Sequence, residues 1–378
     1  MVVASKGVVV IVTRGIVMVV TFMIPFALVF AETGAAFPQE GGPYQWVKYA
    51  FGRPIAGVTS VLYWITNPIW LGGTLVLVAS EAFSSYVVEL TPGSVADWLF
   101  KLAFVWVAIL LAVVSLKTGK VFVNTGAWAK MIVLVLLVGT TLIYGFQNGF
   151  QPLALSGMSP TIAGFLAVGP IVMFAYVGFE APNAASEEMY DAANDTAPAI
   201  RRGALVAMLA YLLPVLAIML VIPADQVSGV DSFMGAVENV FTVYGSAGDA
   251  LLTLTAILFV YALVNQGSSW MIATDRIQAM AAADGTFFNG YFGEFNAKLG
   301  TPLRVNIMSG VMSTIFVVAS TKLVEGDKLM QFDVVLANPP YSIKQWDREA
   351  FRSDPWGRNL FGVPPQGRAD YAFQQHIN

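Results

Sequence analysis

Long apolar runs, separated by short polar stretches, dominate the first 320 or so residues of the chain. Several runs reach the roughly 17–25 residues that a helix needs to cross a bilayer, with almost no charge inside them. Because main-chain polar groups in lipid must bond within their own segment, these runs are predicted to be helices. We place eight spans, at residues 8–30, 55–82, 99–116, 121–146, 161–180, 203–223, 248–273 and 303–321. The pattern predicts a mainly α, polytopic membrane protein.

The pattern changes near residue 327, where the apolar runs give way to sequence typical of a soluble protein. The segment Phe-Asp-Val-Val-Leu-Ala-Asn-Pro-Pro-Tyr occupies residues 332–341. Its aliphatic, β-branched run followed by a rigid Pro-Pro turn predicts a buried strand that ends in a turn. We therefore divide the chain into a membrane region (1–321), a junction (322–331) and a soluble tail (332–378).

Basic residues fall only in every second predicted loop. The alternate loops, at residues 83–98, 147–160 and 224–247, contain no Lys or Arg. The basic loops contain Lys48, Arg53, Lys117, Lys120, Arg201, Arg202, Arg276, Lys298 and Arg304. By the positive-inside rule this alternation assigns the basic loops to the cytoplasm. The amino terminus and everything after the eighth span are then predicted to lie on the other side.

Composition supports the membrane assignment and excludes several kinds of site. The chain is 57% hydrophobic and only 12% charged, whereas soluble domains have about 25% charged residues. It has no cysteine, which excludes disulfides and thiolate metal sites, and a single histidine, His376. No glycine-rich loop is followed by Lys-Ser or Lys-Thr, so nucleotide binding is unsupported. We predict no metal site.

Three motifs in the membrane region carry a family resemblance. They are Ala-Glu-Thr-Gly-Ala-Ala-Phe-Pro-Gln-Glu-Gly-Gly-Pro-Tyr at 31–44, Phe-Ala-Tyr-Val-Gly-Phe-Glu at 174–180, and Ala-Thr-Asp-Arg at 273–276. In this order and spacing, residues 8–321 resemble amino-acid/polyamine/organocation (APC) permeases. The resemblance implies a five-plus-five inverted-repeat transporter of the cell membrane, which moves an amino acid or amine and needs no cofactor. Residue 8 already matches the family's second helix, so we expect helix one and helices ten to twelve to be missing.

The second motif is similar to the family's broken sixth helix, which binds substrate near the middle of the membrane. The resemblance implies that Phe174 stacks over the substrate and that Ala175, Tyr176 and Gly178 line the site. Glu180 would be a carboxylate that responds to a proton or a cation. Two plainer interpretations stay open. Gly178 would mark only a packing kink, and Glu180 would be an ordinary charge at a helix end.

The tail carries a different chemistry. To methylate an adenine amine, an enzyme removes the base from its stack, accepts its N–H bonds on oxygens and holds its ring against an aromatic face. Asn338 and the carbonyl of Pro339 could accept these bonds, Tyr341 could stack, and Pro340 would set the geometry. With the downstream sequence, these residues resemble the catalytic motif of adenine-N6 DNA methyltransferases, in the modification subunit of type I restriction systems.

That family binds S-adenosylmethionine through elements upstream of the Asn-Pro-Pro-Tyr strand, and here the upstream sequence is transmembrane. We therefore predict that the methyl-donor site is absent and the tail inactive. DNA and restriction-modification subunits would be partners only of the tail's intact parent. We interpret the chain as a chimera, in which an incomplete eight-helix part of an APC permease in the lipid bilayer is joined near residues 322–331 to a fragment of an adenine-N6 DNA methyltransferase. Three functional hypotheses stay open: membrane transport, adenine-specific DNA methylation, and neither activity, as a non-transporting membrane scaffold or a product of gene assembly.

Overall fold

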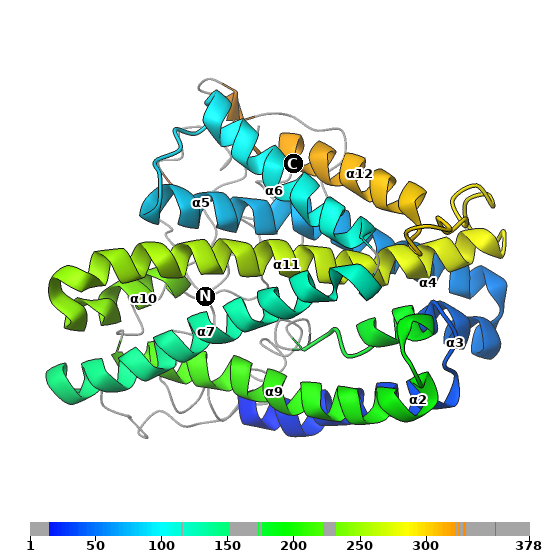
Figure 1. Cartoon of the computed structure of the whole chain (residues 1–378), viewed down its shortest axis with the longest axis horizontal. Coiled ribbons are helices and arrows are strands. Elements are labelled where there is room, and N and C mark those ends of the chain that lie inside the picture. Colours follow the sequence, from blue (N-terminus) through cyan, green and yellow to red (C-terminus); the bar gives the residue numbers. More distant parts are fainter. Residues whose placement is uncertain are drawn as a thin grey trace.

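The computed structural model describes residues 15–114, 116–150, 173, 176–221, 232–321, 324–325, 328–329 and 352. Helices make up most of these ranges, and the long ones run roughly side by side along the longest axis of the molecule (Figure 1). Their bounds are η2 (Val19–Met23), α2 (Ile24–Ala36), α3 (Gly42–Phe51), α4 (Arg53–Trp70), η3 (Leu71–Leu75), α5 (Val76–Tyr86), α6 (Val95–Val113), α7 (Leu116–Asn148), η4 (Ala181–Glu188), α9 (Ala192–Val221), α10 (Ser232–Phe241), η5 (Thr242–Ala247), α11 (Gly248–Ala283) and α12 (Leu303–Thr321).

Seven helical segments of the described chain are long and apolar enough to cross a membrane. They are Gly15–Ala36, Arg53–Tyr86, Val95–Val113, Val121–Asn148, Ala192–Val221, Phe233–Ala283 and Leu303–Ser320. Each overlaps one of the eight predicted spans. The remaining predicted span, 161–180, lies outside the described residues except at its end. The predicted class, a mainly α, multi-pass membrane protein, is confirmed.

Several predicted boundaries were wrong at the end of the bundle where the basic residues gather. Arg201 and Arg202 were placed in a loop, but α9 begins at Ala192 and includes both. Similarly, Arg276 lies within α11, whose 36 residues extend about 54 Å, well beyond the roughly 30 Å of hydrocarbon. Helical turns outside the hydrocarbon carry charge at little cost. Hydropathy therefore predicted the start of α9 too late and the end of α11 too early.

Two short helices were missed altogether. The first is α3, which Gly41 (φ +79°) caps and Gly52 (φ +84°) ends. The helix α10 lies within the stretch predicted as the loop 224–247. In the junction, β1 (Val324–Glu325) pairs antiparallel with β2 (Lys328–Leu329), with Val324 opposite Leu329. The strand and turn predicted at 332–341 lie outside the described residues.

The helix α11 is the centre of the bundle. It packs against α4, α5, α6, α7, α10 and α12, and Figure 1 shows it running through the middle of the molecule. Leu71, Phe104, Ile109 and Met271 are among the buried residues of the largest apolar cluster, which joins α11 to η3, α5, α6 and α12. The helices on either side are thus held to one common neighbour.

Polar and close-range contacts fix α12 in this bundle. Asp275 of α11 is buried and accepts hydrogen bonds from Asn306 Nδ2 and Ser309 Oγ of α12, each at 2.6 Å. Trp64 Nε1 of α4 donates to the same Ser309 hydroxyl at 2.8 Å. Further along, a Cβ atom placed on Gly72 would lie only 2.1 Å from the carbonyl oxygen of Ser313. The helices therefore approach to backbone contact at Gly72.

Candidate functional site

The chain is not helical at residues 176–180, which form the end of the predicted fifth span (161–180) and lead directly into η4. Gly178 adopts φ +129°, a backbone conformation that residues with a side chain rarely adopt. A helix that passed through this position would have to break, and η4 then continues the chain toward α9. Phe174 and Ala175, the first two residues predicted to bind substrate, lie outside the described residues. The role of Gly178 stays a prediction.

Glu180 is fully buried beside this break. One of its carboxylate oxygens accepts a hydrogen bond from the Gly178 amide at 3.0 Å, and the other accepts from the Tyr63 hydroxyl at 3.3 Å. Tyr63 follows Arg53, the first residue of α4, by ten positions, which is about 15 Å along the helix. The carboxylate therefore lies well inside the bundle and is bonded to two neutral donors.

Aromatic side chains surround the broken segment. Tyr176 is buried and packs edge-to-face on Tyr211 of α9, with ring centroids 5.3 Å apart. Trp270 of α11 donates its indole N–H to Thr66 of α4 at 3.3 Å. A Cβ atom on Gly178 would touch that same indole ring at 3.9 Å. Sequence reasoning missed Tyr63, Thr66 and Trp270, because nothing local in α4 or α11 indicates that they meet this segment.

A second polar centre lies at the end of the bundle that carries Lys48, Arg53, Arg276, Lys298 and Arg304, which we call the basic end. This is the end predicted to face the cytoplasm. Arg276 forms ion pairs there with Glu40 and, at 3.0 Å, with Glu188. Burial raises the pKa of the Glu40 carboxyl above its usual value, although the neighbouring Arg276 opposes this shift.

The basic end also contains a more exposed ion pair. Lys48 bonds to Asp284, and the Tyr44 hydroxyl donates to the same Asp284 oxygen at 2.8 Å. Burial disfavours the charged form of Asp284, but the bonds from Lys48 and Tyr44 outweigh it and hold the pKa below its usual value. Asp284 thus stays ionised and ties the loop after α11 to α3.

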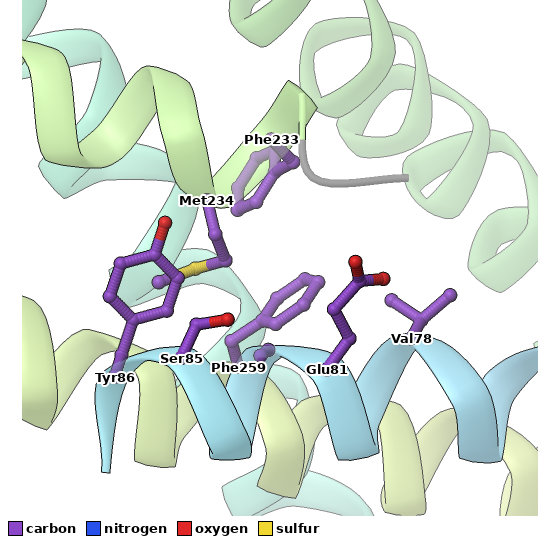
Figure 2. Close-up of a pocket in the computed structure, with 8 residues that line it drawn as sticks. Val78, Glu81, Ser85, Tyr86, Phe233, Met234 and Phe259 are labelled. Carbon is purple, nitrogen blue, oxygen red and sulfur yellow. The ribbon is translucent and has the colours of Figure 1, made fainter. Parts of the chain in front are cut away.

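The opposite end of the bundle has a small cavity between α5, α10 and α11. It is lined by Val78, Glu81, Ala82, Ser85, Tyr86, Phe233, Met234 and Phe259, and Figure 2 shows Glu81 and Tyr86 facing it from the same helix. Its volume of about 30 Å³ is room for about one water molecule. An amino acid does not fit there in this conformation, so the cavity is not a formed substrate site.

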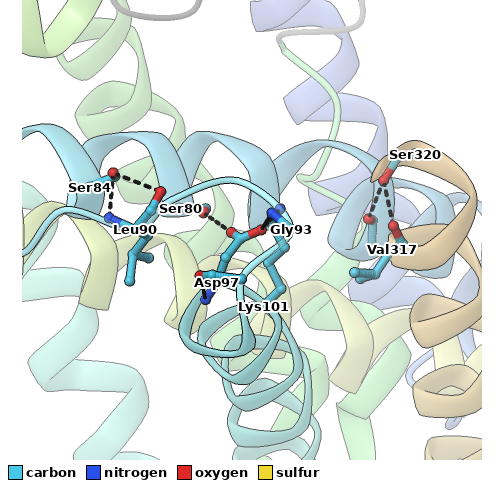
Figure 3. A network of polar contacts seen from close by, with 10 residues as sticks. Ser80, Ser84, Leu90, Gly93, Asp97, Lys101, Val317 and Ser320 are labelled. Atoms are coloured by element: carbon cyan, nitrogen blue, oxygen red, sulfur yellow. Dashed lines mark hydrogen bonds and ion pairs between the residues drawn. The ribbon is translucent and has the colours of Figure 1, made fainter. Parts of the chain in front are cut away.

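A buried ion pair near the same end positions the start of α6. Lys101 bonds at 2.8 Å to Asp97, which lies one turn earlier in α6. The same carboxylate accepts hydrogen bonds from the Ser80 hydroxyl and the Gly93 amide (Figure 3). Every oxygen of this carboxylate is bonded, so the group acts as a structural tie between α5 and α6. Within the described ranges, no cluster of three or more acidic, His or Cys side chains could hold a metal ion.

Two parts of this chain match known protein families. Residues 1–338 match the family model of the amino acid permeases, and residues 308–378 match that of the N-6 DNA methylases. Both resemblances seen in the sequence are thereby confirmed. The matches overlap at residues 308–338, and the junction at 322–331 stays a prediction.

Curated relatives of the chain are transporters. A probable agmatine/putrescine antiporter of Lactococcus lactis is 25% identical over 316 residues, which cover 82% of this chain and 66% of the relative. An uncharacterized transporter of Legionella pneumophila is 28% identical over 305 residues, covering 78% and 63%. A putative arginine/ornithine antiporter of Bacillus subtilis is 26% identical over 323 residues, covering 78% and 66%. The chain spans just under two thirds of the length of these relatives.

Proposed function

Because this chain belongs to the amino acid permease family, we propose that it binds an amino acid or a related amine and carries it across the membrane. The observation that supports the proposal most directly is the break at Gly178 with the buried Glu180 beside it. A broken segment leaves main-chain groups free to bond a ligand inside a membrane protein. An ionisable side chain at such depth is costly to keep and is a candidate for function.

We favour a cationic amine as the substrate. Glu180 bonds only to neutral donors among the described residues, so its negative charge lacks a buried cation to balance it. An ammonium or guanidinium group would supply that balance, and the ring of Tyr176 would offer it an aromatic face. Two relatives are named for agmatine/putrescine and arginine/ornithine exchange, which fits this class. Phe174, Ala175, Tyr176, Gly178 and Glu180 are the proposed substrate-binding residues.

Uptake by the full chain in liposomes tests the proposal. Liposomes loaded with unlabelled agmatine are expected to take up radiolabelled putrescine or arginine faster than liposomes without protein, and faster than they take up leucine. Since the chain spans less than two thirds of its relatives, equilibrium binding of the same ligands is measured in parallel. If the chain neither takes up nor saturably binds putrescine, arginine or leucine, the proposal is rejected. Leucine binding alone would reject the cationic class.

Adenine-N6 methylation is a second candidate, supported by the family match at residues 308–378. The proposed catalytic residues, Asn338, Pro339, Pro340 and Tyr341, lie outside the described residues. Directly upstream is α12, a membrane-length helix, where the methyl-donor elements of that family would be required. We therefore expect no transfer of labelled methyl from S-adenosylmethionine to DNA. Transfer that Asn338→Ala abolishes would overturn this expectation.

A further inference from the structure

Arg276 joins three segments that are far apart in the chain. Its guanidinium bonds to Glu40 in the loop after α2, to Glu188 at the end of η4, and to the Gly300 carbonyl in the loop before α12. Arg276 Nη2 lies 3.0 Å from Glu188 Oε1 and 3.1 Å from Gly300 O. The side chains of Arg276 and Glu40 are only 3% and 4% exposed. These charges have little access to water and depend on one another.

Backbone bonds reinforce the joint between the α2–α3 loop and η4. Arg276 bonds to one carboxylate oxygen of Glu40, and the Glu187 amide donates to the other at 3.2 Å. The Gly41 amide donates to the Ala184 carbonyl at 3.1 Å. Within η4, Ala185 departs from helical geometry at φ −118° and ψ 38°. The segment that directly follows Glu180 is thus kinked in its middle and held at its far end by Arg276.

A cavity of about 590 Å³ reaches this cluster from the basic end. Glu40, Glu187, Glu188, Arg276 and Lys298 are among the residues that line it. On the other side, Ala184 of η4 is buried in an apolar cluster with Tyr44 and Ile277. The ion pairs therefore lie between a hollow on the basic end and the packed segment that leads to Glu180.

We propose that Arg276, Glu40 and Glu188 form an ionic latch that closes the substrate pathway at the basic end. When the latch opens, η4 bends at Ala185 and leaves α11, which connects the cavity with the site at Glu180. One arginine bonds two carboxylates, so its loss leaves both without a partner in a site with little water, which favours an arrangement that exposes them to water. This inference rests on the proposed transport function.

The absence of cysteine from the chain permits a direct test. Ser186 of η4 is 1% exposed, so Ser186→Cys introduces a thiol that reports whether η4 is packed. The full chain with this substitution is placed in lipid nanodiscs, whose two faces are both open, and treated with a membrane-impermeant maleimide. Adding Arg276→Gln is expected to raise the labelling rate roughly tenfold or more, because a broken buried pair strongly favours the open arrangement.

Arg304→Gln is the matched control, since it removes one positive charge at the same end. Arg304 and its partner Glu294 are 34% and 65% exposed, and such surface pairs contribute little. Labelling is expected to stay unchanged. A second reporter, Thr255→Cys in α11, is fully buried and distant in sequence, and is expected to stay protected in every variant. Equal labelling in the two arginine variants, or labelling at both reporters, would overturn the latch.

Glu188→Gln provides an independent variant if Arg276→Gln yields no folded protein. It leaves Arg276 paired with Glu40 and removes one of the three points of attachment. A smaller rise in labelling, about threefold, is expected, and an unchanged rate would reject the proposal. Labelling needs no substrate, so a chain that fails to transport can still confirm the latch, and a transporting chain can still refute it.

Discussion

Replacing Glu180 with glutamine is expected to lower amine exchange about 10- to 100-fold. The carboxylate accepts bonds from the Gly178 amide and the Tyr63 hydroxyl, and charge-assisted bonds of this kind contribute about 1.5–3 kcal/mol each. Glutamine keeps the size of the side chain but removes the charge that would bind a cationic substrate. Every 1.4 kcal/mol changes a rate about tenfold, which sets the expected range. The measurement is initial-rate exchange in liposomes at matched protein content.

Two companion variants separate charge from shape. Tyr63→Phe removes one donor to this carboxylate, at 3.3 Å, but keeps the negative charge. It is expected to reduce exchange by no more than about tenfold, since a long bond to a charged group contributes about 1.5 kcal/mol, the low end of the range. Glu294→Gln removes an exposed carboxylate at the basic end and is expected to leave exchange unchanged. If Glu180→Gln transports as well as the parent chain, Glu180 is an ordinary buried charge and not part of the substrate site.

Replacing Gly72 with alanine is expected to destabilise the bundle by about 3 kcal/mol, as overpacking against a rigid neighbour does. The added Cβ atom would lie 2.1 Å from Ser313 O and 2.8 Å from Ser313 C. Both are backbone atoms, so no side chain can turn away, and α12 itself must move. The measurement is the midpoint of heat-induced loss of the monodisperse peak in detergent, followed by size-exclusion chromatography.

Gly73→Ala is the control for this effect. It changes the next residue of the same π-helical segment, where an added Cβ atom has nothing within 4 Å. Alanine is favoured over glycine in helices by about 1 kcal/mol, so this variant is expected to match or exceed the parent in stability. Equal midpoints for the two alanine variants would show that α12 does not pack on η3 as described.

The membrane helices could be predicted because each one leaves a local signal, a long run without charge. The helices α3 and α10 leave a weaker one, since each has only ten residues and a polar side. The broken segment was also predicted locally, from the motif at 174–180, although its binding role stays a prediction. Its partner Tyr63 could not be found, because 117 positions separate it from Glu180.

The same reasoning applies to Arg276, which the sequence indicated only as a basic loop residue. Its two carboxylate partners are 236 and 88 positions away, so only the folded bundle brings the three charges together. The charge pattern along the chain reports which side of the membrane a loop occupies. It carries no information on which opposite charges pair. Residues that act through long-range pairing are thus the ones that sequence reasoning misses.

The central position of α11 also has a consequence for how the protein is made. Its neighbour α4 ends at Trp70, whereas α11 ends at Ala283. At the usual speed of translation, roughly 5–20 residues per second, α4 waits roughly 10–40 s in the membrane before its main partner is complete. During that time α4, whose buried side chains include Ser60 and Asn67, lacks the helices α11 and α12 that pack against it in the finished bundle. We therefore expect the early helices to expose surfaces that are buried in the finished protein until α11 and α12 have been made.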